Sequence, residues 1–182
     1  MTHAATPRAA AIRLMVFDVD GVMTDGRLYF SDDGHEWKAF HTLDGQGVKL
    51  LQAAGIAVAL ITGRESGAVT ARAKGLGIPH VYQGIRDKHR CLAELIEQLQ
   101  GSWQETGYMG DDLIDLPPLR ACGFSAAPAN AHELVRAQAD FICAARGGDG
   151  AVREVCDFIL KAQDRLEHAM ATCLGLSSWD SA

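Results

Sequence analysis

The stretch "VFDVDGVMTDG", residues 16–26, places an apolar run directly before three carboxylates, Asp18, Asp20 and Asp25. Like charges this close together repel one another, and burying them is costly unless a cation compensates. The carboxylates therefore either lie in a solvated turn, which an Asp-Gly pair favours, or hold a cation and take part in chemistry. Gly21 gives the chain the freedom to turn sharply after the first two carboxylates. The rest of the sequence has to separate these interpretations.

Short apolar runs alternate with helical segments along the chain. Residues 13–19 and 55–63 are continuous apolar runs, which are typical of strands buried on both faces. This alternation predicts an α/β fold, a doubly wound, Rossmann-like parallel sheet with helices on both faces. We expect a single domain over residues 1–182, with its core at about 13–163. Further strands are predicted at 80–84, 106–112, 123–129 and 139–143, and helices at 44–55, 65–77, 87–101 and 150–175.

Glycines mark the predicted helix ends, and apolar spacing marks the buried faces. Gly55, Gly77 and Gly101 follow helical segments, as C-terminal glycines commonly do. The last helix is expected to be one long element that leads into a C-terminal tail, together about 150–182. Its predicted inward face consists of Val152, Val155, Cys156, Ile159 and Leu160.

Residues 26–42 depart from the alternation and predict a β-hairpin. The turn signal is Asp32-Asp33-Gly34, with a short strand on each side. An isolated hairpin is marginally stable, so its aromatic residues are expected to pack on something else. We favour a neighbouring subunit over the parent domain. The aromatic residues are Tyr29, Phe30, Trp37 and Phe40.

Composition excludes several classes of protein. The chain has 182 residues, 48% of them hydrophobic, and a net charge of -6, which fits a globular domain rather than a nucleic-acid-binding protein. No apolar run is long enough to cross a bilayer, and residues 1–13 lack the apolar core of a secretory signal. We expect those residues to be a short, loosely ordered lead-in. The five cysteines are widely spaced and odd in number, which favours a reducing cytoplasm over a disulfide framework.

Polar residues follow four of the predicted strands. In a doubly wound sheet these positions converge at one edge, where ligands bind. Several carboxylates without a histidine or cysteine partner favour Mg²⁺. A lysine and a threonine beside them suit the oxygens of a phosphoryl group, and an aspartate can act as the nucleophile. The converging residues are Asp18, Asp20, Thr62, Lys88, Asp111, Asp112 and Asp115.

The sequence resembles the haloacid dehalogenase superfamily in four motifs, "DVDGVMTDG", "ITGR", Lys88 in "RDKHR", and "GDDLID". The resemblance implies that Asp18 is the nucleophile and Asp20 the general acid and base, while Thr62 and Lys88 hold the phosphoryl group. It also implies Mg²⁺ bound by the Asp18 side chain, the Asp20 backbone carbonyl and Asp111. Asp112 and Asp115 would support the metal from behind these ligands or through water.

The spacing of the motifs leaves no room for a cap domain. In this respect, and over about residues 13–163, the chain is similar to the capless 3-deoxy-D-manno-octulosonate 8-phosphate phosphatases. That resemblance implies a cytoplasmic homotetramer assembled through the hairpins, and a role in lipopolysaccharide precursor biosynthesis. "GGDGAVREVCD" resembles the family's C-terminal segment, but Asp149 stands where the family often has a basic or neutral residue. The implied substrate contacts are Thr62, Gly63, Arg64, Ser66, Arg72 and Lys88.

Two other functions fit parts of the pattern. A phosphatase for a nine-carbon keto-sugar acid 9-phosphate would use the same chemistry, but those relatives commonly carry Glu where this chain has Arg64. A signalling receiver domain would also combine an acidic Mg²⁺ site with Asp, Thr and Lys, without hydrolysing an ester. Its phosphoacceptor lies on a middle strand and its lysine comes later in the chain, so the order of residues here favours the phosphatase.

Overall fold

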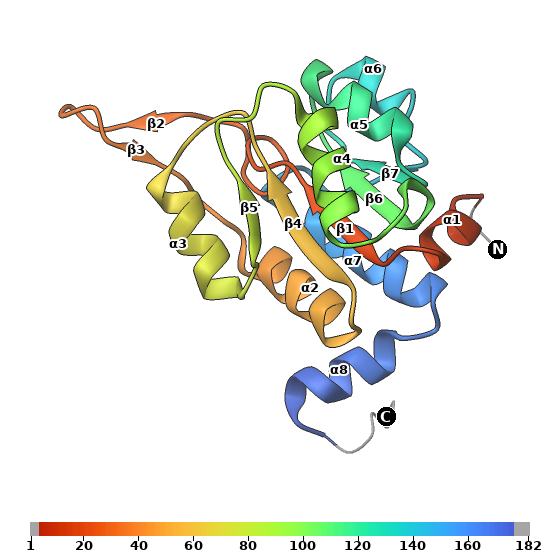
Figure 1. Cartoon of the computed structure of the whole chain (residues 1–182). Coiled ribbons are helices and arrows are strands. Elements are labelled where there is room, and N and C mark those ends of the chain that lie inside the picture. Colours follow the sequence, from red (N-terminus) through yellow and green to blue (C-terminus); the bar gives the residue numbers. More distant parts are fainter. Residues whose placement is uncertain (1–3, 177–182) are drawn as a thin grey trace.

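The computed structural model describes residues 4–176, in which six strands form one sheet in the order β5-β4-β1-β6-β7-β8 (Figure 1). Every neighbouring pair is parallel, which confirms the predicted doubly wound sheet. Counted among themselves, the strands follow the order 3-2-1-4-5-6, which reverses between β1 and β6. The strands are β1 (Leu14–Phe17), β4 (Ala57–Ile61), β5 (His80–Tyr82), β6 (Thr106–Met109), β7 (Phe124–Ala127) and β8 (Phe141–Ile142).

Helices cover both faces of this sheet. Side chains of β1 alternate between two cores, with Met15 and Phe17 in one and Leu14 and Val16 in the other, as the period of two of a strand requires. The first core is closed by α1 (Thr6–Ala10), α2 (Thr42–Ala53), α3 (Gly67–Leu76), α7 (Ala151–Ala162) and α8 (Leu166–Leu174). The second is closed by α4 (Lys88–Gln98), α5 (Leu116–Ala121) and α6 (Glu133–Arg136).

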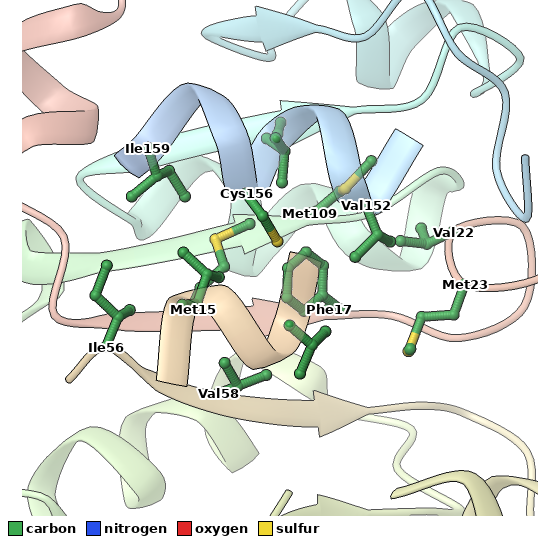
Figure 2. Packing of buried hydrophobic residues seen from close by; sticks show 14 of the residues in the cluster. Met15, Phe17, Val22, Met23, Ile56, Val58, Met109, Val152, Cys156 and Ile159 are labelled. Atoms are coloured by element: carbon green, nitrogen blue, oxygen red, sulfur yellow. The ribbon is translucent and has the colours of Figure 1, made fainter. Parts of the chain in front are cut away.

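Figure 2 shows the first core, where Phe17 and Met15 of the central strand lie near Cys156 of α7. All five residues predicted to face inward on the last helix are fully buried. Burial of each such side chain contributes roughly 1.5–3 kcal/mol. This packing holds β1 rigidly, and with it the residues that follow its carboxyl end.

Two predictions at the chain ends are wrong. The single helix expected over 150–175 is broken into α7 and α8, because Asp164 adopts a left-handed φ of 54° and the Arg165 N–H returns to the Leu160 carbonyl. The expected loose lead-in contains α1, which packs against α7 and buries Ala9 completely. The parts of these predictions that concern residues 1–3 and 177–182 lie outside the described residues.

The remaining helix ends agree with the glycine signals in two of three cases. Gly55 and Gly77 have positive φ and follow α2 and α3. The helix predicted to end at Gly101 ends at Gln98, and Gln100 adopts the positive φ instead. In the described part of the chain, no helix is both long and apolar enough to span a bilayer.

The predicted hairpin is present and projects from the sheet (Figure 1). It consists of β2 (Tyr29–Phe30) and β3 (Glu36–Trp37), joined by a turn in which Gly34 has a φ of 83°. Phe30 and Trp37 are 60% and 66% exposed, whereas Phe40 packs on the first core of its own chain. Between β1 and β4 the chain forms only this hairpin and α2, and between β4 and β5 only α3, so there is no cap domain.

Candidate active site

The polar residues that follow the strands meet at the carboxyl ends of β1 and β6, where the strand order reverses. They surround a cavity of about 300 Å³. The motifs that are far apart in sequence therefore form one site, as expected from the fold. The cavity is lined by Asp18, Asp20, Gly26, Leu28, Thr62, Gly63, Arg64, Lys88, Asp111, Asp112, Ile114 and Asp115.

The loop after β1 passes very close to the loop after β6. Gly21 has a φ of 89°, and a Cβ there would lie 2.0 Å from Asp111 Oδ2. The buried Thr24 hydroxyl accepts hydrogen bonds from the Gly21 and Gly26 N–H groups. Gly147, from the glycine-rich turn before α7, backs this loop so closely that a Cβ would lie 1.7 Å from the Gly21 carbonyl oxygen. Glycine is required at both places because backbone or carboxylate atoms occupy the space.

Lys88 is the first residue of α4 and is 2% exposed. Its Nζ lies 2.9 Å from Asp18 Oδ1 and 2.7 Å from Asp115 Oδ1. Burial by itself would lower the pKa of Lys88, but the two carboxylates outweigh it and raise the pKa above its usual value. The lysine is therefore held charged at the cavity floor, despite an unfavourable position at a helix N-terminus.

Asp115 is fully saturated with hydrogen bonds. Its Oδ1 also accepts from the buried Tyr108 hydroxyl at 2.7 Å, and its Oδ2 accepts from the N–H groups of Asp111 at 3.0 Å and Asp112 at 3.2 Å. Because both of its carboxylate oxygens already accept hydrogen bonds, Asp115 orients Lys88 and the Asp111 loop and is not free to bind a ligand.

The pKa values of the Asp18 and Asp111 carboxyl groups are both raised. Burial and repulsion from Asp115 raise the pKa of Asp18 to about 7, although Lys88 opposes the shift. Burial, with the charges of Asp18 and Asp115, raises the pKa of Asp111 to about 8. Asp111 Oδ1 is buried and accepts no hydrogen bond from any residue between 4 and 176.

Carboxylate oxygens of Asp18, Asp111 and Asp115 lie within 4.8 Å of one another. Three hard oxygen donors, among them Asp111 Oδ1 with neither a hydrogen bond nor an ion pair in the described chain, fit a divalent cation such as Mg²⁺. A bound cation would also relieve the repulsion that raises these pKa values. Because Asp115 is saturated, Asp18 and Asp111 are the side chains best placed to supply ligands.

The predicted site residues fall into two groups. Thr62 is buried at the end of β4, and Gly63 and Arg64 follow it along the cavity wall. Ser66 and Arg72 do not line the cavity. The Ser66 N–H donates to the Gln83 side chain at 2.7 Å at the start of α3, and Arg72 donates to the His41 carbonyl and lies over the Phe40 ring.

Three polar residues at the site were not predicted from the sequence. Tyr108 sits in an apolar strand and reads as core, so nothing in its spacing indicates the bond to Asp115. Lys38 and Glu36 belong to the hairpin, yet Lys38 pairs with Asp20 and Glu36 pairs with both Lys38 and Arg64. Alternation along β3 could have suggested that Glu36 and Lys38 share one side, opposite Trp37.

Comparison with known proteins agrees with this geometry. Residues 78–155 match the family model described as haloacid dehalogenase-like hydrolase. This match, together with the relatives described next, places the fold and the site in the class of haloacid dehalogenase-like hydrolases.

Highly similar proteins identify one family within this class. The 3-deoxy-D-manno-octulosonate 8-phosphate phosphatase KdsC of Yersinia pestis is 49% identical over 89% of this chain and 87% of its own length. A probable YrbI family phosphatase from Pseudomonas syringae has a TM-score of 0.92 at 50% identity, covering 95% of this chain and 98% of the other. The 3-deoxy-D-manno-octulosonate 8-phosphate phosphatase of Moraxella catarrhalis, solved with magnesium, phosphate and KDO, has a TM-score of 0.91 at 42% identity, with coverage of 95% and 99%. The chain belongs to the 3-deoxy-D-manno-octulosonate 8-phosphate phosphatase family.

Proposed function

We propose that the protein is a Mg²⁺-dependent phosphomonoesterase that hydrolyses 3-deoxy-D-manno-octulosonate 8-phosphate to the free sugar acid and phosphate. The observation that carries the proposal is the buried Asp18, held by Lys88 beside the partner-free oxygen of Asp111 at the edge of the cavity. A carboxylate held at a cavity, beside a lysine and a candidate cation site, is equipped to accept a phosphoryl group. The strong similarity to named phosphatases supports the choice of substrate.

In this proposal the Asp18 side chain, the Asp20 backbone carbonyl and Asp111 would hold Mg²⁺. When bound, Mg²⁺ offsets the repulsion between the phosphoryl oxygens and the Asp18 carboxylate. Asp112 and Asp115 support these ligands from outside. Asp115 does so through the Asp111 N–H, which donates to it.

Asp18 attacks phosphorus and forms an aspartyl-phosphate as the ester P–O bond breaks. Asp20 gives a proton to the leaving alkoxide, then takes one from the water that attacks phosphorus and releases phosphate. Lys88 and Thr62 stabilise the phosphoryl oxygens. Lys88 is already fixed by its two carboxylates, so it needs little reorganisation during the reaction.

The substrate's carboxylate and sugar hydroxyls would meet the outer wall of the cavity. Gly63 allows close approach there, and Arg64, 44% exposed at its side chain, can reach an anionic group. Ser66 and Arg72 remain candidate contacts from the family resemblance, although they lie outside this cavity in the single chain. A nine-carbon 9-phosphate is the alternative substrate, and Arg64 favours the octulosonate.

We further propose that residues 1–182 act as one phosphatase domain and assemble into a homotetramer through the hairpin, where a neighbour takes the place of a cap. The exposed Phe30 and Trp37 support an interface there. We place the protein in the cytoplasm, in lipopolysaccharide precursor biosynthesis. Five free cysteines, four of them buried, fit a reducing compartment.

The test is phosphate release from the octulosonate 8-phosphate and from a nonulosonate 9-phosphate, each with Mg²⁺ and with a chelator. We expect preference for the first ester and loss of activity on chelation. Preference for the second ester would show that the nonulosonate 9-phosphate, and not the octulosonate 8-phosphate, is the substrate. Stable phosphorylation from a small donor without ester hydrolysis would indicate a receiver module instead.

A further inference from the structure

The hairpin sends one side chain into the active site of its own chain. Lys38 follows β3, and its side chain is 2% exposed although Trp37 next to it is 66% exposed. Alternation along an extended strand explains the contrast, because Glu36 and Lys38 point to one side and Trp37 to the other. The Lys38 ammonium contacts Asp20 Oδ1.

The Asp20 carboxylate belongs to a closed ring of four charged side chains. Glu36 Oε1 lies 2.7 Å from Lys38 Nζ, and Glu36 Oε2 is paired with Arg64. The Arg64 Nε in turn lies 3.9 Å from Asp20 Oδ2. Exposed ion pairs contribute little, but here the lysine side chain is buried and both carboxylates are mostly covered, at 16% and 20% side-chain exposure.

The ring treats the two oxygens of Asp20 differently. Oδ1 is occupied by Lys38, whereas Oδ2 is buried and forms no hydrogen bond with any described residue. If the Lys38–Asp20 ion pair served only to attach the hairpin to the domain, any acidic residue on the nearby surface would be sufficient. This ion pair instead fixes the orientation of one carboxylate beside the candidate nucleophile.

We propose that Lys38 is a positioning residue for Asp20, which it holds so that Oδ2 is the atom that exchanges a proton. Glu36 keeps Lys38 on Oδ1 and away from the phosphoryl group. The inference rests on the proposed function, in which Asp20 protonates the leaving alkoxide and then deprotonates water. It also gives the hairpin a role within its own subunit, separate from any contact with a neighbour.

Two esters with different leaving groups test the inference. The sugar 8-phosphate releases an alkoxide, which needs a proton, whereas p-nitrophenyl phosphate releases a stable phenolate. We expect Lys38→Met to lower kcat for the sugar ester at least roughly tenfold, because general acid–base catalysis is impaired. KM should change little, since Lys38 touches Asp20 rather than substrate. The first-turnover release of p-nitrophenolate should be nearly unchanged.

Two further variants complete the design. Lys38→Arg keeps a cation on Asp20 and should restore part of the lost kcat. Lys74→Met removes an exposed lysine from α3, outside the cavity lining, and should match the wild type in both assays and in melting temperature.

Several outcomes would overturn the inference. A raised KM with unchanged kcat would make Lys38 a substrate ligand. Equal losses on both esters with a lowered melting temperature would make it structural. If the wild type hydrolysed neither ester, the proposed function would be wrong, and a crystal structure of Lys38→Met would decide the inference by itself. A changed Asp20 conformation would support positioning, and an unchanged one would contradict it.

Discussion

The floor of the cavity and the hairpin differ in how deeply their side chains are buried. At the floor, Lys88, Asp115 and Tyr108 are almost completely buried and satisfy one another at 2.7 Å. The hairpin has two strands of two residues each and exposes its aromatic side chains to solvent. The contrast shows that one chain brings the proposed reacting groups together, while the hairpin leaves apolar side chains exposed, where the proposed interface would cover them. Lys38 is the point where the two regions meet.

The largest effect is expected from the floor. Asp18→Asn removes the proposed nucleophile and should lower kcat by roughly 10⁴-fold or more, as loss of a covalent catalyst does. Phosphate release from the sugar ester measures this directly. The circular dichroism spectrum and molar mass should match those of the wild type. Retention of more than a tenth of the activity would remove Asp18 from its role.

Lys88→Met should lower the free energy of unfolding. The substitution leaves Asp18 and Asp115 facing each other in the interior without a cation, and breaking a buried ion pair from one side costs about 3–5 kcal/mol. Urea unfolding in chelator measures the loss, with Lys74→Met as the exposed control. A loss below 1 kcal/mol would mean that the floor is more hydrated than its burial indicates.

Without metal, the protein should become less stable as pH rises. The folded pKa values of Asp18, about 7, and Asp111, about 8, exceed the ordinary 3.8, so the folded state keeps protons that the unfolded chain releases. Stability should therefore fall steadily between about pH 4 and pH 8. Urea unfolding in chelator at pH 5 and pH 8 measures the fall. Mg²⁺ or Asp111→Asn should reduce it, and a stability that rises with pH would contradict the charge balance.

Tyr108→Phe should have a smaller effect. It removes the hydroxyl that donates to Asp115 Oδ1, while Lys88 remains on the same oxygen. A loss of about 1 kcal/mol in the free energy of unfolding is expected for one buried hydrogen bond. Thermal denaturation measures it. A neutral result would show that Lys88 alone satisfies the carboxylate.

The hairpin aromatics should barely affect the stability of the subunit. Phe30→Ser with Trp37→Ser changes exposed residues, so the free energy of unfolding of the monomer should change by less than about 0.5 kcal/mol. If the proposed tetramer forms through the hairpin, the molar mass by light scattering should nevertheless fall below that of the wild type. Phe40→Ser is the matched variant on the hairpin's inner end, where the ring packs on the core, and it should destabilise the fold. An unchanged mass for the double variant would exclude the hairpin as the interface.

The sheet and the motif residues could be predicted because their signals are local. A short apolar run such as 13–19 is typical of a strand buried on both faces, and strands of one parallel sheet bring their polar ends together. The break at Asp164 and the docking of α1 could not be predicted, because each depends on packing against distant parts of the chain.

Contacts between side chains that lie far apart in the sequence could not be predicted either. The sequence places Asp20 and Lys38 eighteen residues apart, on either side of the hairpin turn. Only the fold of the hairpin shows that they touch. Likewise, Ser66 and Arg72 follow the cavity residues 62–64 closely in the sequence, but in the fold the Ser66 N–H contacts Gln83 and Arg72 lies over Phe40. Family motifs indicate which residue types are present, whereas the direction of each side chain is set by tertiary packing.

The most direct test of the central claim is to trap the phosphoryl group on the enzyme. Wild-type protein is mixed with the sugar 8-phosphate and Mg²⁺, quenched within the first turnover, reduced with borohydride and analysed by peptide mass spectrometry. Reduction of an aspartyl-phosphate converts that aspartate to homoserine, so we expect homoserine at position 18, and none in Asp18→Asn. Homoserine at another aspartate, or none while phosphate is released at the normal rate, would contradict Asp18 as the nucleophile.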